Sequence, residues 1–318
     1  MTRTRKSTGR ISFVGAGPGD PGLLTRRAYD ALAGVDHVVF DRTVPESMLT
    51  SIRLITPEQA EFSPAEGAPG DVAKVLLSAA RSGLHAVHLV AGDPFGHESV
   101  VKEVQAVART AVQFEVVPGV SQATGVATYA GVPLSGVRTS ADVDDVTTID
   151  FDGLAAASIR GSVALAVDAG DLGAVRDGLL AAGVEPTTPV AVTGDGTGET
   201  QYTATSTVDS VVAAALGFAG RVVLTVGAGV THRDRLSWWE NRALYGWKVL
   251  VPRTKEQAGV MSELLRAYGG MTDDLRRGQG AAVGNPDAEL HGRSKDRIGS
   301  PARGDSNDTN VLPIGSVA

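Results

Sequence analysis

The sequence predicts an α/β fold with two domains, and three observations support this prediction. Residues 11–32 hold a short apolar strand, a turn with three glycines and a helix-like segment, which is a typical opening of an α/β domain. Four strand-like segments alternate with helices up to about residue 130, which favours a mainly parallel sheet. The alternation then restarts near residue 137, and a chain of 318 residues is long enough for two domains.

The first domain is predicted to span residues 11–136. Its later strands, each with the turn that follows it, are expected at residues 36–44, 86–96 and 112–120. These turns contain charged residues or glycines. Its later helices show helical apolar spacing or small residues with a glycine stop, and they are expected at residues 71–83, 100–110 and 121–134. Residues 56–70 contain Pro and Gly and are expected to form a loop.

The second domain is predicted to span residues 137–232. Its strands are rich in Val and Ala, and they are expected at residues 145–150, 162–167, 188–193 and 221–230. Its helices are expected at residues 171–183 and 208–216. The strand that begins at residue 188 is followed by another glycine turn, so both domains are expected to place such turns at strand ends.

The two ends of the chain differ from this pattern. Residues 1–10 are expected to be disordered, and residues 233–247, which hold all three Trp residues, to form a linker. Residues 248–270 are predicted to form one further strand and helix. A unit of this size is too small to bury its own apolar faces. Residues 271–318 contain no Phe, Tyr or Trp and are predicted to be disordered. The break after Gly270 suggests a truncated or frame-shifted reading frame.

Composition excludes several classes of function. A net charge of -7 gives no support to nucleic-acid binding. The absence of Cys excludes disulfides and thiolate metal sites, and we predict no metal site. The apolar runs are shorter than the roughly 18 residues that a membrane helix needs, and no apolar segment follows the basic start as in a signal peptide. We therefore expect a cytoplasmic protein that does not bind membranes.

The first glycine turn leaves three alternatives open on its own. It resembles the dinucleotide fingerprint, which would indicate an NAD-dependent enzyme, but Asp20 stands where that fingerprint has its third glycine. It is also compatible with a turn that binds no ligand. The third alternative can be recognised only when the other glycine turns of the chain are considered as well.

Read together, the turns resemble the tetrapyrrole methylase family, most closely its uroporphyrinogen-III C-methyltransferases. The segments that carry the resemblance occur in the family's order, and they are VGAGPGDPGLLT (14–25), FDR (40–42), AGDPF (91–95), FEVVPGVS (114–121), YAGVPL (129–134) and TPVAV (188–192) with Gly196, Thr197 and Gln201. Residues 248–270 are similar to the opening of a uroporphyrinogen-III synthase domain. The resemblance covers residues 11 to about 232.

The resemblance implies two α/β domains around a cleft, usually in a homodimer, with S-adenosyl-L-methionine (SAM) bound between the domains. It implies methyl transfer to C2 and C7 of uroporphyrinogen III, a tetrapyrrole, giving precorrin-2 for cobalamin and sirohaem biosynthesis. Such a reaction needs alignment of the reactants and a base, and an acidic substrate needs cationic or N–H donors. The twenty or so residues of synthase-like sequence are expected to carry no synthase activity.

The resemblance also implies site residues. Those expected to contact or enclose SAM are Pro18, Gly92, Asp93, Ser121, Ala123, Val167, Ala191, Gly196 and Thr197. Asp41, Arg42 and His97 are the candidates for catalysis and substrate binding, with Arg42 placed to meet a substrate carboxylate. For Asp93 the alternative is an aspartate that only caps a turn.

Several residues depart from the family pattern. Where the family has Arg-Gly-Gly-Glu, this chain has Ser99, Val100, Val101 and Lys102, and Val167 replaces a Met that packs on SAM. Substitutes for the missing Arg and Glu would have to come from His97, Glu98 or Lys102. The competing hypothesis is therefore a methylase-like domain that has lost catalysis and serves as a binding or scaffold module.

Overall fold

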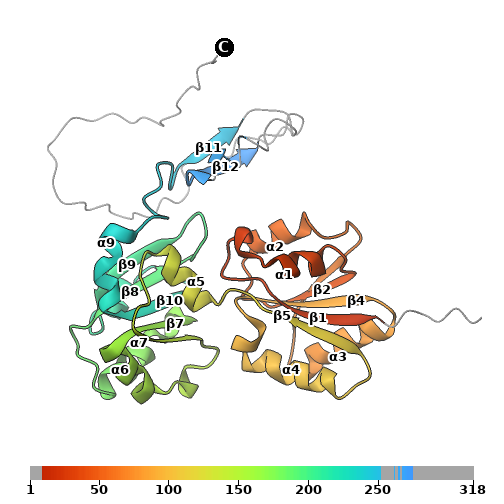
Figure 1. Cartoon of the computed structure of the whole chain (residues 1–318), viewed down its shortest axis with the longest axis horizontal. Coiled ribbons are helices and arrows are strands. Elements are labelled where there is room, and N and C mark those ends of the chain that lie inside the picture. Colours follow the sequence, from red (N-terminus) through yellow and green to blue (C-terminus); the bar gives the residue numbers. More distant parts are fainter. Residues whose placement is uncertain (1–8, 252–260, 262–263, 266, 275–318) are drawn as a thin grey trace, which may run out of the picture. The chain divides into compact units, whose positions relative to one another are not determined.

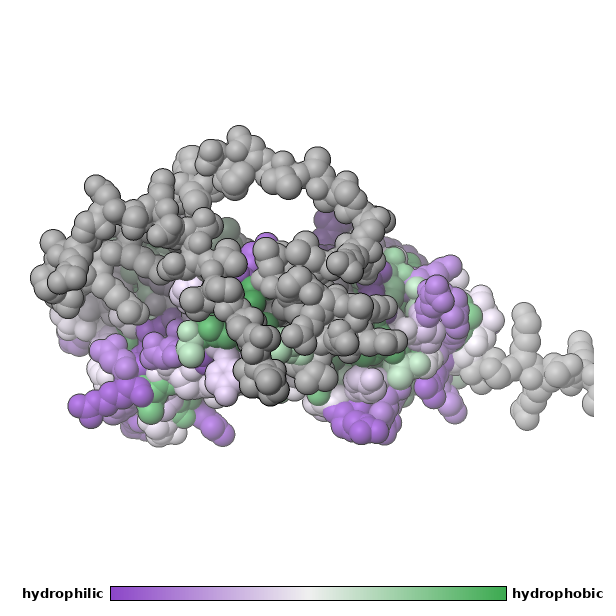
Figure 2. All heavy atoms as spheres, turned by 90° about the horizontal axis from the view of Figure 1, so that it is seen from above, coloured by the Kyte–Doolittle hydropathy of each residue, from purple (hydrophilic) through white to green (hydrophobic). Residues whose placement is uncertain are grey.

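The structure is a computed structural model that describes residues 9–251, 261, 264–265 and 267–274. Its strands form two five-stranded sheets and one two-stranded sheet (Figure 1). Each five-stranded sheet carries helices, so the mixed α/β fold predicted from the sequence is confirmed. The face seen in Figure 2 mixes hydrophilic and hydrophobic residues. No helix among the described residues is long and apolar enough to cross a membrane.

The first sheet is fully parallel. Its strands are β1 (Arg10–Gly15), β2 (His37–Phe40), β3 (Glu61–Pro64), β4 (His85–Val90) and β5 (Gln113–Val117). They pair in the order β3-β2-β4-β1-β5. Every residue of β4 is buried, as expected for a central strand covered on both faces.

Helices cover both faces of the first sheet, and they are α1 (Arg26–Leu32), α2 (Glu46–Arg53), α3 (Pro69–Arg81) and α4 (Glu98–Ala108). Side chains alternate along each strand. Val14 of β1 therefore packs in one core with α1 and α2. Its neighbour Phe13 packs in the other core with α3 and α4.

The strand order places a natural ligand position beside β1. The chain leaves β1 toward one side of the sheet and leaves β4 toward the other, which makes a switch point outside their carboxyl ends. A dinucleotide-binding Rossmann sheet would place β1 beside β2. Here β4 lies between β1 and β2, so the NAD-dependent alternative from the sequence is wrong.

Three glycines let the ends of β1, β4 and β5 approach closely. A Cβ atom on Gly15 would lie 2.5 Å from the Gly92 carbonyl oxygen, and one on Gly119 would lie 2.1 Å from it. Gly17 and Gly92 also exchange backbone hydrogen bonds, with N–O distances of 3.2 and 2.9 Å. The turn after β1 is thus fixed to the turn after β4 by main-chain contacts alone.

The second sheet is mixed. Its strands are β6 (Val137–Asp142), β7 (Gly161–Asp168), β8 (Pro189–Gly194), β9 (Tyr202–Thr207) and β10 (Arg221–Gly227), in the order β6-β7-β10-β8-β9. Only the β6–β7 pair of this sheet is parallel, and the other three pairs are antiparallel. Antiparallel neighbours need no crossover helix, which explains why β8 and β9 follow one another through a turn.

The two faces of the second sheet are covered differently. The helices α6 (Phe151–Arg160), α7 (Leu172–Ala181) and α8 (Val211–Ala214) pack on one face in a Val- and Leu-rich core. On the other face, α5 (Gln122–Tyr129) packs against Ala164 and Ala166 of β7. Because α5 directly follows β5 of the first sheet, it carries the turn after β5 onto the second sheet.

Two predicted elements of the domains are wrong. Residues 56–70, expected as a loop, contain β3 and the start of α3. Residues 145–150, expected as a strand, contain the 3-10 helix Val146–Thr148, because the Asp145 carboxylate accepts hydrogen bonds from both Thr147 N and Oγ1. The strand at this place is β6, which ends earlier, at Asp142. The sequence analysis made no prediction for α2, α6 or β9.

The structure also differs from the disorder expected near the ends. Gly9 and Arg10 are ordered, since β1 begins at Arg10. The strand β11 (Lys248–Val251) pairs in parallel with β12 (Met271–Asp274), four residues that were expected to belong to the disordered tail. The helix expected between these strands lies mostly outside the described residues, and so do residues 1–8 and 275–318.

The close approach at Gly15 makes a direct prediction. In Gly15→Ala the new methyl group meets backbone atoms of Gly92 and Gly119, which cannot turn aside as a flexible side chain would. We expect the free energy of unfolding to fall by about 1–3 kcal/mol, measured by urea denaturation. The matched control is Gly70→Ala, at the second residue of α3, where a Cβ meets nothing within 4 Å and stability should not fall. Equal stability of Gly15→Ala and the wild-type chain would contradict this account of the strand ends.

Candidate functional site

Two neighbouring cavities lie at the carboxyl ends of the first sheet's strands. The smaller has a volume of about 610 Å³ and is lined by, among others, Pro18, Gln122, Val126, Ala166 and Gly196. The larger has a volume of about 760 Å³, and its lining includes Asp41, His97, Asp142 and Asp144. Both cavities therefore combine residues from the two five-stranded sheets and their turns.

The turn after β1 forms one wall of the smaller cavity. Pro18 rests on α5 at Gly125, where a Cβ atom would lie 2.8 Å from the Pro18 ring. The Asp20 backbone N–H donates to Thr197 Oγ1 at 2.9 Å, and the Asp20 carboxylate accepts from the Tyr129 hydroxyl at 2.7 Å. This turn is thus held by α5 and by the turn after β8.

The turn after β4 is organised by Asp93. One carboxylate oxygen accepts from Phe95 N at 2.9 Å and the other from Gly119 N at 3.0 Å. These are the contacts of a turn-capping aspartate, and they also join the turn after β4 to the turn after β5. Gly92 has a φ of +68°, in the left-handed region that favours glycine.

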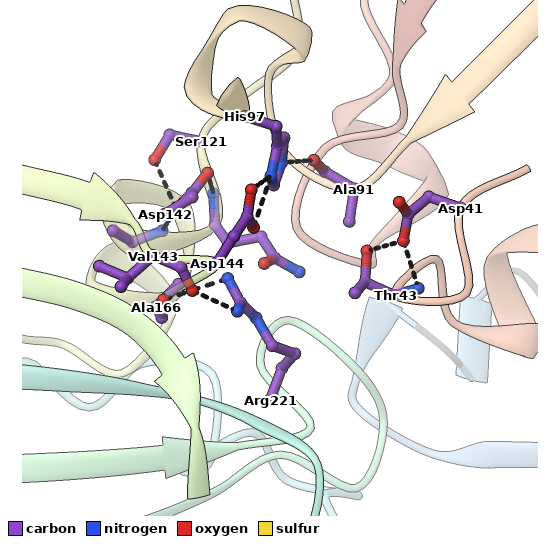
Figure 3. Close-up of polar contacts among 12 residues, drawn as sticks. Asp41, Thr43, Ala91, His97, Ser121, Asp142, Val143, Asp144, Ala166 and Arg221 are labelled. Atoms are coloured by element: carbon purple, nitrogen blue, oxygen red, sulfur yellow. Dashed lines mark hydrogen bonds and ion pairs between the residues drawn. The ribbon is translucent and has the colours of Figure 1, made fainter. Parts of the chain in front are cut away.

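The start of α5 receives a carboxylate from β6. Asp142 accepts from Ser121 Oγ at 3.2 Å, from Gln122 N at 3.2 Å and from Ala123 N at 3.0 Å (Figure 3). Asp142 is buried, with 9% of its surface exposed. A negative charge at a helix N-terminus interacts favourably with the free N–H groups there, so β6 is fixed to α5.

An acidic loop, residues 142–145, continues from Asp142 and contacts His97, the residue directly before α4. His97 Nδ1 lies 3.0 Å from the Asp144 carboxylate, and His97 Nε2 lies 2.9 Å from the Ala91 carbonyl oxygen (Figure 3). Because both ring nitrogens face acceptor oxygens, both are placed to donate a hydrogen. The geometry favours the imidazolium form of a buried His97 in an ion pair with Asp144.

The pKa values of this pair agree with the geometry. Burial acts to lower the pKa of His97, but the hydrogen bond and charge of Asp144 outweigh it and hold that pKa above its ordinary value. Burial acts to raise the pKa of Asp144, but the hydrogen bond and charge of His97, together with the charge of Arg221, outweigh burial and hold this pKa below its ordinary value. His97 is therefore a donor with both nitrogens engaged, which is unsuited to the role of a base.

Arg221, at the start of β10, holds the other side of the acidic loop. Its guanidinium donates to the carbonyl oxygens of Val143 at 2.6 Å and Ala166 at 3.1 Å (Figure 3). Its positive charge also contributes to lowering the pKa of Asp144. The loop's charges are thus compensated from both five-stranded sheets, by His97 on one side and by Arg221 on the other.

The turn after β8 has an unusual backbone. Asp195 and Thr197 have φ angles of 48° and 65°, which non-glycine residues rarely adopt. Thr197 N donates to Gln201 Oε1 at 2.8 Å, which helps to hold this conformation. Gly196 packs on α5, where a Cβ atom would lie 2.4 Å from Val126. Strained backbone of this kind is concentrated at functional sites.

Asp41 and Arg42, the pair after β2, face different surroundings. Asp41 Oδ1 accepts from Thr43 N at 2.8 Å and from Thr43 Oγ1 at 2.7 Å, and Asp41 lines the larger cavity (Figure 3). Arg42 lines the smaller cavity but is largely exposed and pairs with Glu66 at 3.0 Å. An exposed pair of this kind is weak, so the Arg42 side chain is accessible to an anionic ligand.

Of the nine residues expected at the SAM site, Pro18 and Gly196 line the smaller cavity, and the other seven line neither of the two cavities. Two of these seven lie in the cores of the second sheet. Val167 points into the core under α6 and α7, because neighbouring strand residues face opposite sides of the sheet. Its neighbour Ala166 is the residue that lines the smaller cavity. Ala191 is fully buried and packs with Ala130, Val132 and Val230, away from both cavities.

The altered segment at residues 99–102 lines the larger cavity with Ser99 and Lys102. Lys102 forms an ion pair of 2.8 Å with Glu98, one helical turn earlier in α4. His97 is likewise paired with Asp144. The residues proposed as substitutes for the family's Arg and Glu are therefore all engaged with partners in the chain.

The expected linker, residues 233–247, packs on the site. Trp239 Nε1 donates to the Gly198 carbonyl oxygen at 2.9 Å, and the Trp239 ring lies 4.4 Å from the Tyr129 ring. The Arg242 guanidinium lies 3.4 Å from the Trp239 ring centre, within the range of a cation–π contact. The Trp-rich segment thus supports the same Tyr129 that binds Asp20.

Glu240 of this segment extends the support to the turn after β8. Its carboxylate accepts from Gln201 Nε2 at 2.9 Å and from Thr203 Oγ1 at 2.6 Å, and it pairs with Arg233. Gln201 in turn holds Thr197, as described above. A chain of hydrogen bonds therefore runs from the Trp-rich segment through two turns of the site.

Sequence reasoning missed four residues of this arrangement: Gln122, Asp142, Asp144 and Arg221. Three acidic residues within positions 142–145, at the end of β6, were the available signal for the acidic loop. Gln122 lies between two residues that were predicted, Ser121 and Ala123. Arg221 gave no local signal, because its contacts depend on the tertiary fold.

Comparisons with known proteins agree with this arrangement. Residues 10–212 match the family model described as tetrapyrrole (corrin/porphyrin) methylases. The chain is 33% identical over 244 residues to siroheme synthase 1 of Aeromonas salmonicida, an alignment that covers 73% of this chain and 51% of that protein. It is 28% identical over 277 residues to porphyrin biosynthesis protein HemD of Ruminiclostridium josui, covering 82% of this chain and 54% of that protein. The chain spans about half the length of these curated relatives.

Solved structures show the same fold. The uroporphyrin-III C-methyltransferase of Thermus thermophilus, complexed with S-adenyl homocysteine, aligns with a TM-score of 0.58 and 26% identity over 70% of this chain and 93% of that one. The cobalt precorrin-4 methyltransferase CbiF aligns with a TM-score of 0.62 and 23% identity over 71% of this chain and 98% of that one. The chain belongs to the tetrapyrrole methylase family, as its sequence motifs predicted.

The His97–Asp144 pair predicts a pH dependence of stability. A raised pKa of His97 contributes stability below the unfolded value of about 6.5, and this is lost as pH rises through the folded pKa. The lowered pKa of Asp144 contributes stability above its unfolded value, and this is lost as pH falls. The pair should therefore stabilise most between the two unfolded pKa values, about 3.9 for Asp and about 6.5 for His.

The measurement is the thermal midpoint of the wild-type chain and of Asp144→Asn across pH. We expect the stability advantage of the wild type to be largest at mildly acidic pH and to shrink as the pH rises through neutral to alkaline values. Asp177→Asn, which removes an exposed partner of Arg176, is the control and should follow the wild-type profile. An advantage that does not change with pH would show that no ionised His97 is involved.

Proposed function

We propose that this protein is a SAM-dependent methyltransferase that methylates C2 and C7 of uroporphyrinogen III to give precorrin-2. One observation carries the proposal. The turns after β1, β4 and β8 and the start of α5 meet around neighbouring cavities in a chain of the tetrapyrrole methylase family. The structural relative complexed with S-adenyl homocysteine supports the choice of cofactor.

The residues present fit a ligand of this kind. A cavity of about 610 Å³ falls within the range of roughly 300–1,000 Å³ that holds small ligands. Gln122 lines it and is only 7% exposed, and its Oε1 has no hydrogen-bond partner in the described part of the chain. A buried acceptor without a donor is costly, so Gln122 is ready to accept a hydrogen bond from a ligand amino or hydroxyl group.

The residues that would hold the cofactor come from both sheets. Pro18, Gln122, Ala166 and Gly196 line the smaller cavity and would contact the cofactor directly. Gly92, Asp93, Ser121, Ala123 and Thr197 line neither cavity, and their role at the cofactor remains a prediction. Ala166 takes the place expected for Val167, and Ala191 has no cavity contact. When bound, SAM supplies the methyl group of the reaction. The glycine turns allow the main chain to approach the ligand closely, and the surrounding turns restrict the access of water to it.

Asp41 is the candidate proton acceptor for the substrate. It lines the larger cavity, and its Oδ1 is fixed by Thr43 N and Oγ1. The fixed carboxylate presents Oδ2 as the atom that would take the proton from the substrate carbon. Arg42, accessible beside it, is the candidate partner of a substrate carboxylate, because the guanidinium binds carboxylates through two N–H groups.

A specific observation favours a second candidate function. The larger cavity is rich in carboxylates, with Asp41, Glu98, Asp142, Asp144, Asp145 and Asp150 in its lining, against Lys102 and His97. Most of these carboxylates are engaged in the contacts of the chain, but their charge opposes an octacarboxylate substrate. This favours the alternative of a degenerate binding or scaffold module, in which cofactor binding persists without turnover.

Other expectations from the sequence remain predictions. They are the homodimer, the cytoplasmic location, the absence of nucleic-acid and membrane partners and of a metal site, and the relation of residues 248–270 to a uroporphyrinogen-III synthase. No group of described His, Asp and Glu residues has the arrangement of a metal site. The expected domain boundaries also remain predictions.

The proposal is tested by turnover. The full chain is incubated anaerobically with SAM and uroporphyrinogen III, and precorrin-2 is followed by its absorption, while calorimetry measures binding of S-adenosyl-homocysteine. We expect product from the wild type and a loss of kcat of roughly 10²- to 10⁴-fold in Asp41→Asn, the range for a general base. Asp30→Asn, which alters an exposed carboxylate of α1, should leave the rate unchanged.

The outcomes separate the two candidates. Binding of S-adenosyl-homocysteine without any product would exclude the methyltransferase and leave the binding module. No binding at high ligand concentration would exclude both. Full activity of Asp41→Asn would leave the methyltransferase standing and remove Asp41 from the reaction.

A further inference from the structure

Glu240 is a largely buried carboxylate in the Trp-rich segment, and it lines neither cavity. Its side chain is 13% exposed. One oxygen, Oε1, accepts from Gln201 Nε2 at 2.9 Å and from Thr203 Oγ1 at 2.6 Å, while Oε2 pairs with Arg233. The match to the family model ends at residue 212, so this carboxylate comes from a part of the chain beyond the matched residues.

Glu240 fixes the orientation of the Gln201 amide. A carboxylate only accepts hydrogen bonds, and a backbone N–H only donates. Gln201 must therefore direct Nε2 toward Glu240 and Oε1 toward Thr197 N, which lies 2.8 Å away. Gln201 and Thr197 are each 2% exposed, so water has little access to replace either bond. The left-handed backbone of Thr197, with a φ of 65°, thus depends on a carboxylate two contacts away.

From Thr197 the contacts return to the Trp-rich segment. Thr197 Oγ1 accepts from Asp20 N at 2.9 Å, and the Asp20 carboxylate accepts from the Tyr129 hydroxyl at 2.7 Å. The Tyr129 ring lies 4.4 Å from the ring of Trp239, which directly precedes Glu240 in the chain. The contacts therefore form a closed ring through the turns after β8 and β1, the helix α5 and the Trp-rich segment.

The two turns in this ring supply lining of the smaller cavity. Pro18 and Gly19 belong to the turn after β1, and Gly196 and Gly198 belong to the turn after β8. A Cβ atom on Gly19 would lie 3.1 Å from the Gly196 carbonyl oxygen and 3.1 Å from Thr197 Oγ1. A shift of the turn after β8 would therefore be transmitted to the turn after β1.

A second path from Glu240 reaches the cavity through β8. The hydroxyls of Thr203 and Thr193 lie 3.0 Å apart. Because the Thr203 hydroxyl has one hydrogen and donates it to Glu240, the Thr193 hydroxyl must be the donor between the two. Thr193 is 2% exposed and lines the smaller cavity. Glu240 thus sets the direction of the hydrogen bonds on two paths that end at the cavity wall.

We propose that Glu240 is a positioning residue of the cofactor site, which fixes the wall of the smaller cavity through Gln201 and Thr203 and so sets the affinity for the cofactor. This inference rests on the proposed function. Glu240 lies outside the cavity, so the position of the turn after β8 carries its effect. The Trp-rich segment is then part of the working site, although its described residues line neither cavity.

The test is the affinity of the full chain for S-adenosyl-homocysteine, measured by calorimetry. In Glu240→Gln the new amide has one oxygen, and whichever way it turns, its NH₂ group meets either Gln201 Nε2 or the Arg233 guanidinium. We expect binding to weaken roughly tenfold, as for the loss of one charge-assisted hydrogen bond. The control is Asp234→Asn, which removes the same charge from an exposed residue of α9 (Arg233–Leu236) in the same segment. It should change the affinity less than about threefold.

A double variant tests the path through Gln201. Glu240→Gln combined with Gln201→Glu exchanges donor and acceptor, so that the amide at position 240 donates to a carboxylate that still accepts from Thr197 N. The amide oxygen at position 240 then remains free to accept from Arg233. We expect this double variant to bind within about threefold of the wild type. Gln201→Glu alone sets two carboxylates against each other and should bind no better than Glu240→Gln.

A milder variant covers the case in which Glu240→Gln does not fold. Glu240→Asp keeps the charge for Arg233 but shortens the reach to Gln201, and it should also weaken binding, by roughly threefold or more. Circular dichroism and the thermal midpoint report whether each variant is folded. Hydrogen–deuterium exchange of the unliganded chain reports the turn itself. Exchange at residues 195–201 should be faster in Glu240→Gln and should return to the wild-type rate in the double variant.

Four results would overturn the inference. Wild-type affinity in a folded Glu240 variant would remove Glu240 from the site, and unfolding of both single Glu240 variants would show that it supports the whole domain instead. A double variant as weak as Glu240→Gln would show that the pair with Arg233 matters and the path through Gln201 does not. In these three cases the wild type binds, so the proposed function stands. Absence of binding by the wild type would overturn the proposed function and this inference together.

Discussion

The contact on which the rest of the site depends is the meeting of main chains at Gly15, Gly92 and Gly119. At these positions a Cβ atom would lie within 2.6 Å of a neighbouring backbone or carboxylate atom, so only glycine permits the approach. The contact brings the ends of β1, β4 and β5 together at the switch point of the parallel sheet. Asp93 then fixes the turn after β4 to the turn after β5. The helix α5 begins directly after the turn that follows β5. The cavities exist where they do because these turns cannot separate.

Charge compensation explains how the acidic loop can lie against a buried surface. Burying a carboxylate is costly unless it is paired or hydrogen-bonded. Asp142 receives three donors at α5, and Asp144 receives His97 while Arg221 adds charge nearby. The loop is therefore joined to His97 by an ion pair, to α5 by hydrogen bonds from Ser121 and two backbone N–H groups, and to β10 by a hydrogen bond from Arg221 to the Val143 carbonyl oxygen. The same carboxylates leave the larger cavity short of cations, which is the feature of this chain that most separates cofactor binding from methylation of an acidic substrate.

Most of the first sheet and the positions of the turns were predictable, because strand, glycine turn and helix signals are local. The loop predicted at residues 56–70 was wrong because β3 has only four residues and one neighbour, β2, to hold it. The strand predicted at residues 145–150 was wrong because a capping aspartate competed with the apolar pattern. At the site, the positions of turns such as the one at Gly92 could be predicted from local sequence motifs. Contacts such as that of Asp142 with α5 could not be predicted, because they join segments that are distant along the chain. The position of Val167 could not be predicted either, because it depends on the face of the sheet to which each β7 residue points.

The central claim is that turns from both five-stranded sheets form one cofactor site. Hydrogen–deuterium exchange of the full chain, with and without S-adenosyl-homocysteine, tests it most directly. The account predicts slower exchange in the ligand-bound chain at residues 17–20, 91–97, 121–126 and 194–198, together and at the same ligand concentration. Protection confined to the turns of one sheet, with the ligand shown to be bound, would contradict it.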